Sequence, residues 1–426
     1  MERTLYTEQE AMQFIRENDV RFIKLFFTDV YGSIKSISIQ PSELERAFIQ
    51  GISFDASAVK GFLSVSKSDL FIVPDPSTLC VLPWRPQSGR VVRFFCNIRY
   101  ADGTPFEGDT RKMLSDFVEK AHAKGYDFNI GTECEFYLFK LDDKGNPTKE
   151  PFDNASYCDL APRDKGENVR REICLTLEQM GVHPESSHHE TGPGQNEVDF
   201  RYSDVLNAAD NLQTFKTVVK TIAARNGLFA CFMPKPLAGK PGNGLHINIS
   251  LMKNGMNLFA GNEMSDEAKS FLAGILNRSV EFTPFMNTVP NSYMRLGEFE
   301  APRYVSWSRQ NRSQLIRIPA ARDDGARIEY RASDPVCNPY TSCYVLLSAG
   351  LEGIENKAVL PPSTDLNLFN ASLEDVKNLK KLPASLSEAV EAARKSDFTD
   401  RIFPKLLIDF FNSPENDITD PEFGDF

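Results

Sequence analysis

The stretch Glu185-Ser-Ser-His-His-Glu190-Thr-Gly-Pro-Gly-Gln-Asn-Glu197 carries three carboxylates and two imidazoles. Carboxylates that converge on a small volume raise each other's pKa unless a divalent cation supplies positive charge. Pro193-Gly194 predicts a turn, and the alternation of polar and apolar residues from Glu197 to Tyr202 predicts a half-buried strand. Glu190 and Glu197 would then lie side by side. The stretch therefore predicts a metal site, and an acidic surface hairpin with solvated histidines is the alternative.

Length and charge narrow the class of protein. A chain of 426 residues is longer than single cores usually grow, which favours two domains. A net charge of -11 leaves no basic face for a phosphate backbone, so the chain is expected to bind small molecules, with no nucleic acid and no membrane as partner. No apolar run approaches the roughly 18 residues of a membrane span, and no signal-peptide core is visible. Eight scattered cysteines without a Cys-x-x-Cys pair indicate reduced, mostly buried thiols and a cytoplasmic protein.

The amino-terminal part predicts a small mixed α/β domain. Thr7-Glu-Gln-Glu10 is a capping box and predicts a short helix, and Pro41 marks a second helix start. Strand-like runs cover residues 21–30, 33–39, 70–73, 78–82 and 91–100. Asp102-Gly-Thr-Pro105 ends this pattern. We therefore predict two domains, over residues 1–103 and 104–426.

Two further acids lie on a predicted strand. The run from Phe128 to Phe139 places Glu133 and Glu135 on one face and apolar residues on the other. A charged face beside a core is costly without partners, so both acids are candidates for a site. A solvated sheet face is the alternative.

Three helices brace these strands. They are predicted over residues 109–124, from a capping box at Asp164 and Glu167 to Gly181, and over residues 204–226.

His246 follows a loop rich in proline and glycine. It shares one strand face with Asn248 and Ser250, where it is either a ligand or a structural histidine. The loop has the glycine spacing of a P-loop, but Leu245 replaces the required lysine. Any ATP phosphates must therefore be held by other groups.

Arginines supply such groups. They recur at Arg295, Arg303, Arg309, Arg312, Arg317, Arg327 and Arg331. Guanidinium groups suit phosphates and carboxylates. Arg327-Ile-Glu329-Tyr-Arg331 places two arginines and one glutamate on one strand face, which either holds an anion with a cation or is a solvated basic strand. The clusters together predict a metal-dependent site for phosphoryl transfer.

These motifs resemble those of type I glutamine synthetase, the bacterial and archaeal ATP-dependent glutamate–ammonia ligase. The resemblance covers roughly residues 105 to 360 and rests on Glu133-Cys-Glu-Phe-Tyr-Leu-Phe139, Ser187-His-His-Glu190, Gly194-Gln-Asn-Glu197, Met233-Pro-Lys-Pro236, Gly244-Leu-His246, Asn311-Arg-Ser313, Ile316-Arg-Ile-Pro319, Arg327-Ile-Glu329, Asp334-Pro335 and Asn338-Pro-Tyr340. Phe54-Asp-Ala-Ser-Ala-Val-Lys-Gly-Phe62 resembles a further family segment. The resemblance implies an α+β fold, with a small N-terminal β-grasp domain and a large catalytic domain whose curved antiparallel sheet is flanked by helices.

The resemblance also implies roles at a site that holds two or more Mg²⁺ or Mn²⁺ ions and ATP. The first metal would be held by Glu135, Glu190 and Glu197, and the second by Glu133, His246 and Glu329. The nucleotide would contact Glu185, Tyr202, Ser250, Arg317 and Arg327. L-Glutamate would be bound by Gly242, Arg295 and Arg331, and ammonium by Asp55, Tyr157 and Glu190. Catalytic roles fall to Asp55, which deprotonates ammonium, Arg312, which contacts the transferred phosphoryl group, and Glu300, which lies on a flap.

The implied reaction joins ammonia to the γ-carboxylate of L-glutamate through γ-glutamyl phosphate, giving L-glutamine, ADP and phosphate. The implied assembly is a homo-oligomer of six-membered rings, a dodecamer when two rings stack, with active sites between neighbouring subunits. Asp55 would then act in the site of the adjacent subunit.

Departures from the family pattern keep two alternatives open. Ala58 replaces a serine, Pro241 replaces an asparagine, and the flap from Arg295 to Glu300 is one residue shorter than usual. All three lie on the substrate side, so a γ-glutamyl-amine ligase acting on a polyamine or another amine is the runner-up. A non-catalytic family member should have lost metal ligands, yet all six are present.

Regulation and ring stacking are expected to differ as well. Phe369 occupies the place of the family's adenylylation tyrosine, so the chain resembles a short form without that tyrosine. The tail over residues 412–426 is acidic and interrupted by Pro414 and Pro421, unlike the helix that usually joins two rings.

Overall fold

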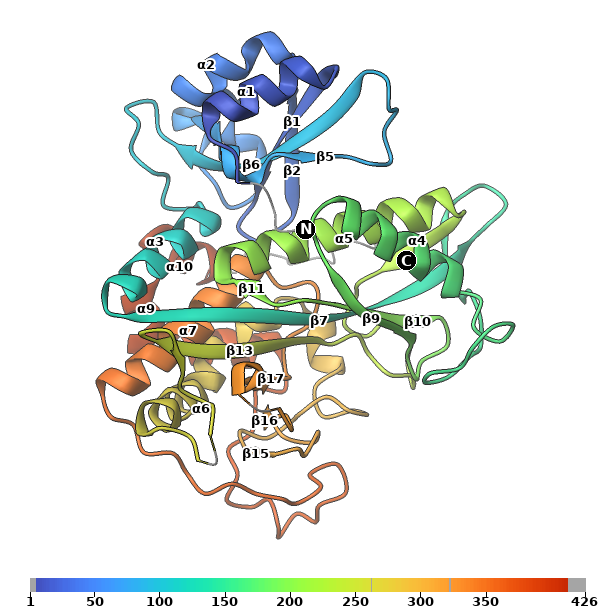
Figure 1. Cartoon of the computed structure of the whole chain (residues 1–426). Helices are drawn as coiled ribbons and strands as arrows, with labels where there is room; N and C mark the ends of the chain where they lie inside the picture. Colours follow the sequence, from blue (N-terminus) through green and yellow to red (C-terminus); the bar gives the residue numbers. More distant parts are fainter. Residues whose placement is uncertain (1–4, 262, 322, 413–426) are drawn as a thin grey trace.

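The computed structural model describes residues 5–261, 263–321 and 323–412. Two sheets organise the chain, and Figure 1 shows the smaller one in a separate lobe above the larger. The six-stranded sheet has the order β2-β1-β6-β4-β3, with β5 added to β6. The eleven-stranded sheet has the main order β15-β16-β17-β13-β7-β10-β9. Both the α+β class and the pairing of a small with a large lobe are as predicted.

The small lobe holds two helices beside its sheet. Its elements are α1 (Glu8–Glu17), β1 (Val20–Thr28), β2 (Ile34–Ile39), α2 (Leu44–Ile49), β3 (Ile52–Asp55), β4 (Asp69–Pro74), β5 (Cys80–Val81) and β6 (Arg90–Arg99). The capping box at the start of α1 is confirmed, because Thr7 N donates to Glu10 Oε2 at 2.8 Å and Glu10 N donates to Thr7 Oγ1 at 3.3 Å. The predicted strand over residues 78–82 is wrong in length, because Asp75 accepts a hydrogen bond from Ser77 N and starts a 3₁₀ turn there.

The large lobe contains the remaining elements. They are α3 (Thr110–Ala123), β7 (Tyr126–Leu141), β8 (Pro147–Pro151), α4 (Glu167–Gln179), β9 (Pro184–His189), β10 (Gln195–Phe200), β11 (Ser203–Asp204), α5 (Val205–Arg225), β12 (Leu228–Cys231), β13 (Leu245–Lys253), β14 (Met256–Asn257), α6 (Asp266–Met286), β15 (Trp307–Arg309), β16 (Ile316–Ile318), β17 (Ile328–Tyr330), α7 (Pro339–Glu355), α8 (Leu386–Arg394), α9 (Asp397–Ile402) and α10 (Lys405–Asn412). None of these described helices has the length and apolar character that crossing a bilayer requires.

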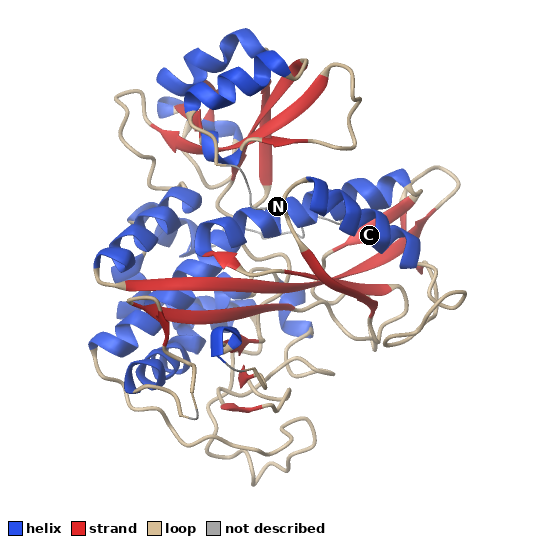
Figure 2. Ribbon diagram, viewed as in Figure 1, coloured by secondary structure: helices blue, strands red, loops and turns tan. Residues whose placement is uncertain are grey.

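The two faces of β7 differ in chemistry, as its alternating sequence predicts. Cys134 and Phe136 are fully buried, and the Phe136 ring packs on Phe215 of α5 with centroids 6.0 Å apart. Figure 2 shows the long central strands passing beneath α5, which separates them from the small lobe. The opposite face of β7 carries Glu133 and Glu135. The helices therefore cover the apolar face and leave the acidic face for the site.

Buried polar contacts fix the small lobe on the large one. Arg111 of α3 is 4% exposed, and its Nη2 lies 2.9 Å from both Asp75 and Asp210 carboxylates. Gly32 turns with a φ of 85°, its carbonyl accepts from Gln213 Nε2 at 2.7 Å, and a Cβ there would meet the Asn338 backbone at 2.7 Å. Only glycine satisfies both constraints at that turn.

One predicted helix start is wrong. Asp164 and Glu167 do not form a capping box, because α4 begins after Gly166 without a side-chain cap. The Asp164 carboxylate instead accepts hydrogen bonds from Gly166 N and from Arg170.

Two further predictions are not tested by the structure. The tail over residues 412–426 lies, from residue 413 onward, outside the described residues. The division at residue 103 stays a prediction.

Candidate active site

Strand register brings the predicted acids together. β7 pairs with β10 so that Glu135 lies opposite Glu197, and β13 pairs with β7 so that His246 lies opposite Glu133. β17 continues the row, with Glu329 opposite Asn248 of β13. Like charges in directly opposite positions destabilise a sheet. Several strands therefore place acidic side chains on one face of the sheet. Repulsion between these charges destabilises the sheet, and a bound cation would remove that repulsion.

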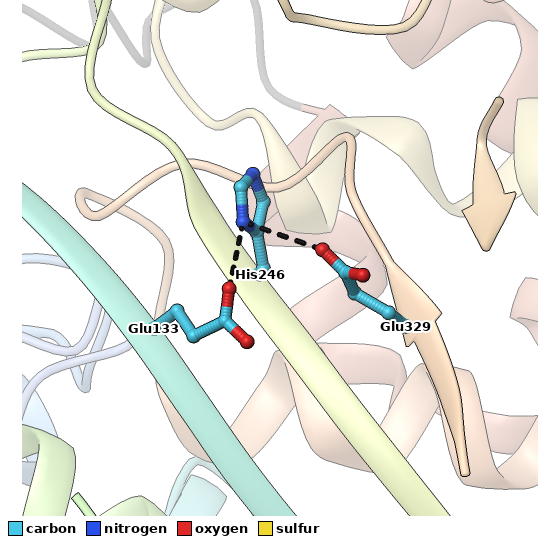
Figure 3. Close-up of side chains that lie close together, drawn as sticks. All are labelled: Glu133, His246 and Glu329. Carbon is cyan, nitrogen blue, oxygen red and sulfur yellow. Dashed lines mark hydrogen bonds and ion pairs between the residues drawn. The ribbon is translucent and has the colours of Figure 1, made fainter. Parts of the chain in front are cut away.

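The first cluster joins Glu133, His246 and Glu329. Figure 3 shows the imidazole between the two carboxylates. His246 Nδ1 lies 3.2 Å from a Glu133 oxygen and 3.5 Å from a Glu329 oxygen, and the ligand atoms of the three residues lie within 4.8 Å of one another. Burial alone would raise the pKa of Glu133, but the hydrogen bond with His246 holds that pKa at about 2. The carboxylate is thus ionised and able to hold a cation.

Arginines of the neighbouring strands contact this cluster. Glu329 is fully buried, and its carboxylate pairs with Arg317 at 2.5 Å and also with Arg331. Burial would raise the pKa of Glu329, but Arg331 and His246 lower it below its ordinary value. A cation would compete with these guanidinium groups for Glu329, and the phosphate that it carries would bind the guanidinium groups in place of Glu329.

The second cluster joins His188, Glu190 and Glu197 at the hairpin of the opening stretch. His188 Nε2 lies 2.8 Å from Glu190 Oε1 and 3.8 Å from Glu197 Oε1. Burial and the Asp199 carboxylate raise the pKa of Glu197 well above its ordinary value. Glu190 and Glu197 are thus neighbours, as predicted.

Glu135 borders this second cluster. Its Oε2 accepts hydrogen bonds from Gly244 N at 2.7 Å and from Gln195 Nε2 at 3.1 Å. Burial and the charge of Glu190 raise the pKa of Glu135 to about 8. The oxygen and nitrogen donors of both clusters suit Mg²⁺ or Mn²⁺, and a divalent cation would offset the mutual repulsion of the carboxylates.

A third buried group consists of Asp153, Asp164 and His189, but its charges are already matched. His189 is fully buried, with Nε2 2.8 Å from Asp153 Oδ1 and Nδ1 2.6 Å from the Glu190 carbonyl. Asp164 pairs with Arg170. Both nitrogens of His189 face acceptors, so the imidazole donates from both and fixes the backbone of Glu190. The solvated-histidine alternative is therefore wrong for His189.

A cavity of about 130 Å³ opens beside the second cluster. Its walls include Glu135, Glu190, Gly242, His246, Arg295 and Glu300. Arg295 is buried and donates to the carbonyls of Ala332 at 2.9 Å and Ser333 at 3.1 Å. A Cβ on Gly242 would lie 2.2 Å from the Pro234 carbonyl, so the loop requires glycine there.

Of the predicted nucleotide residues, Arg317 pairs directly with Glu329 of the first cluster, and the others make contacts outside that cluster. Ser250 donates to the Ala326 carbonyl at 3.0 Å, and Arg327 donates to Asn248 at 2.9 Å. Glu185 and Tyr202 are exposed near the outer end of the hairpin.

The predicted ammonium residues are not brought together within one chain. Tyr157 lies near the second cluster, with its ring centroid 5.2 Å from that of His188. Asp55 instead ends β3 in the other sheet, where it is exposed and accepts from Ser57. Arg312 is exposed, and its carbonyl accepts a hydrogen bond from Arg331.

Two polar residues of the site were given no role from the sequence. His188 lies opposite Glu197 in the β9–β10 hairpin, and Asn248 donates to Glu133 at 2.9 Å. The strand alternation that marks His246 also marks Asn248. Pairing the two arms of the hairpin about the predicted turn at Pro193-Gly194 would have placed His188 opposite Glu197.

Two clusters of carboxylate and imidazole groups, with arginines on the next strands, define a metal-using enzyme. The chain matches the family model "Glutamine synthetase, catalytic domain" over residues 107–417 and the model "Glutamine synthetase, beta-Grasp domain" over residues 19–101. The chain belongs to the glutamine synthetase family. Its β-grasp and catalytic parts confirm the predicted fold class.

Individual relatives agree with this family. The glutamine synthetase of Methanosarcina mazei is 46% identical over 92% of this chain and 89% of its own length. That of Staphylococcus epidermidis is 44% identical over 93% and 91%. Among solved structures, a GmaS/ADP complex has a TM-score of 0.86 at 30% identity, with 94% of each chain covered. Plasmodium falciparum glutamine synthetase has a TM-score of 0.84 at 25% identity, with 96% of each chain covered.

Proposed function

We propose that this chain is a glutamate–ammonia ligase that uses ATP to convert L-glutamate and ammonia into L-glutamine, ADP and phosphate. The observation that carries the proposal is the row of acids and His246 across β10, β7, β13 and β17, with Arg317 and Arg331 at one end and a small cavity at the other. A γ-carboxylate is a poor acceptor of nitrogen until phosphorylation turns one of its oxygens into a leaving group. The site therefore needs both a phosphate end and a carboxylate end.

Divalent metal use follows from family membership, and we assign the ions to Mg²⁺ or Mn²⁺. Glu133, His246 and Glu329 would hold one ion, and Glu135, Glu190 and Glu197 another, with His188 beside them. Bound there, the ions would neutralise phosphate charge and act as Lewis acids. His189 and Asn248 would orient the ligands Glu190 and Glu133 through their hydrogen bonds.

The remaining residues would bind, orient and protect the reactants. Arg317 and Arg327 would contact the nucleotide phosphates and Arg312 the transferred phosphoryl group, while Glu185, Tyr202 and Ser250 would lie around the nucleoside. Gly242, Arg295 and Arg331 would hold L-glutamate so that its γ-carboxylate attacks in line. Charged donors at these positions favour the transition state, where negative charge spreads over the phosphoryl oxygens.

Ammonium would bind between Tyr157, Glu190 and Asp55 of the neighbouring subunit. Asp55 would take a proton from ammonium, and the resulting ammonia would attack the γ-carbonyl carbon while phosphate leaves. Glu300 would cover the intermediate on the flap. Because Asp55 lies in the small lobe, this arrangement requires a homo-oligomer with shared sites, which we propose to be a hexameric ring or a dodecamer of two rings.

Ammonia is favoured over an organic amine as acceptor. The relatives at 44–46% identity are named glutamine synthetases, whereas the GmaS structure is 30% identical. The six metal ligands also argue against a non-catalytic member. All eight cysteines are free thiols, which fits the reducing conditions of the cytoplasm, our proposed location.

Subunit mixing tests the shared site. Asp55→Ala and Glu329→Ala chains should each be inactive, because one lacks the base and the other a metal ligand. Dissociated, mixed and reassembled, they should regain glutamine synthesis at interfaces that combine the two intact halves. Each variant reassembled alone is the control. Mixed oligomers that are confirmed by native mass spectrometry and stay inactive would contradict a shared site.

A screen of acceptors tests the reaction itself. Phosphate release with ATP and glutamate is measured with ammonia and with a panel of organic amines. Ammonia should give the highest kcat/KM. An organic amine that exceeds ammonia tenfold would replace the proposal by a γ-glutamyl-amine ligase.

A further inference from the structure

The flap, residues 295–300, forms one wall of the cavity at the proposed substrate site. Glu298, Phe299 and Glu300 all line that cavity. Gly297 and Phe299 both adopt left-handed backbone conformations, with φ of 83° and 52°. Phenylalanine rarely adopts this conformation, so surrounding contacts must hold it there.

Lys235, from the loop before β13, supplies those contacts. Its side chain is only 3% exposed. Its Nζ lies 2.7 Å from Glu298 Oε2 and 4.6 Å from the centre of the Phe299 ring. A buried ammonium is costly without a counter-charge, and the flap provides one through Glu298 and a favourable ring face through Phe299. Lys235 therefore favours the position of the flap seen here.

The backbone of Lys235 is fixed on the residues that precede the flap. Lys235 N donates to Asn291 Oδ1 at 2.7 Å, and Asn291 Nδ2 donates back to the Lys235 carbonyl at 3.1 Å. The neighbouring Pro234 carbonyl accepts from Asn243 N at 2.9 Å, next to Gly242 of the cavity wall. Hydrogen bonds thus fix the backbone of Lys235, and its side chain contacts the flap from that position.

We propose that Lys235 is a positioning residue that holds the flap closed through Glu298 and Phe299 and thereby keeps Glu300 over the reacting carboxyl. The inference rests on the proposed function, because a closed flap matters only if the site forms an acyl phosphate. The side chain of Glu298 is 55% exposed, so water weakens the pair and the flap can still open to release product.

The consequence of a loose flap is a competing hydrolysis. Water would attack the γ-carbonyl carbon of γ-glutamyl phosphate, the carbon–oxygen bond to phosphate would break, and phosphate would leave with the electron pair. The proton of the attacking water would pass to solvent. The products are glutamate and phosphate, so ATP is consumed without glutamine.

The test compares this leak with synthesis in the assembled full-length enzyme. The leak is glutamate-dependent phosphate release without ammonia, and synthesis is glutamine formation with ammonia. Lys235→Met and Glu298→Gln each remove one charge and keep the approximate shape of the side chain. Each should raise the ratio of leak to synthesis about two- to fivefold, the factor that a partly exposed ion pair provides. The double variant should be no worse than the more affected single variant, since both remove the same contact.

Two controls separate positioning from folding. Glu298→Asp keeps the charge and should stay closer to the wild-type ratio than Glu298→Gln. Glu374→Gln, at a side chain that is 77% exposed and far from the flap in sequence, should leave the ratio unchanged. If Lys235→Met fails to assemble, the test rests on Glu298→Gln alone. The Glu298 side chain is 55% exposed, so replacing it should not prevent folding.

The possible outcomes separate the role of Lys235 from the proposed ligase activity. An unchanged ratio in assembled Glu298→Gln, or additive effects in the double variant, would overturn the role of Lys235 and leave the ligase intact. A wild-type enzyme that releases no phosphate from ATP with glutamate and ammonia would overturn both.

Discussion

Metal binding to the candidate site should release protons below pH 8. Burial and the charge of Glu190 raise the pKa of Glu135 to about 8 in the metal-free site, and a cation binds the ionised form. At pH 7 about nine in ten Glu135 side chains are then protonated before metal binds, and at pH 9 about one in ten. Binding should therefore release about 0.9 proton from Glu135 at pH 7 and about 0.1 at pH 9, and the apparent affinity should rise roughly tenfold over that interval.

Titration calorimetry of the metal-stripped enzyme with Mn²⁺ measures this release, when it is repeated in buffers of different ionisation enthalpy. Glu135→Gln cannot ionise, so its proton release at pH 7 should fall below the wild-type value by about 0.9. Glu374→Gln should match the wild type, because that side chain is 77% exposed. Equal release at pH 7 and pH 9 in the wild type, or an undiminished release in Glu135→Gln, would refute the reasoning.

Four further predictions concern single residues. His189→Gln should weaken Mn²⁺ binding about tenfold or more in the same calorimetry, because it removes the group that orients Glu190; unchanged affinity would exclude that role. Gly274→Ala should lower the free energy of unfolding by about 1–3 kcal/mol, since the added Cβ would lie 2.2 Å from a backbone oxygen of α7. Urea unfolding measures this change, and Gly325→Ala, with nothing nearer than 3.7 Å, should be neutral. Ala58→Ser should lower the KM for ammonium about fivefold with little change in kcat, because it restores one hydrogen-bond partner; an unchanged KM would speak against a role for that position. Incubation with an adenylyltransferase should add no nucleotide mass, because Phe369 has no hydroxyl, and a modified peptide around it would contradict this.

Much of the site could be predicted because strands alternate strictly. Glu133, Glu135, His246 and Glu329 lie on one sheet face since a period of two fixes the direction of each side chain. The predicted turn at Pro193-Gly194 was equally informative, because a turn determines which residues of a hairpin are neighbours. In these cases the local sequence pattern was sufficient to predict which side chains lie together.

The contacts that depend on tertiary packing could not be predicted. His189 meets Asp153 across 36 positions of sequence, and β13, β14, α6 and a 3₁₀ helix lie between Lys235 and Glu298. Neither pair has a spacing that a strand or helix would impose. The start of α4 was wrong for a different, local reason, because Asp164 is engaged by Arg170 of that same helix and is not available as a cap.

The facing acids of β7 and β10 also bear on how sequences in this family can change. Glu135 opposite Glu197 is a pairing that stability alone would remove, and replacing either by an apolar residue should strengthen the metal-free sheet. Selection for folding alone would therefore not retain the row. Its presence in this chain is a record of selection for chemistry, and a descendant that lost the reaction should become a more stable protein than its working ancestor.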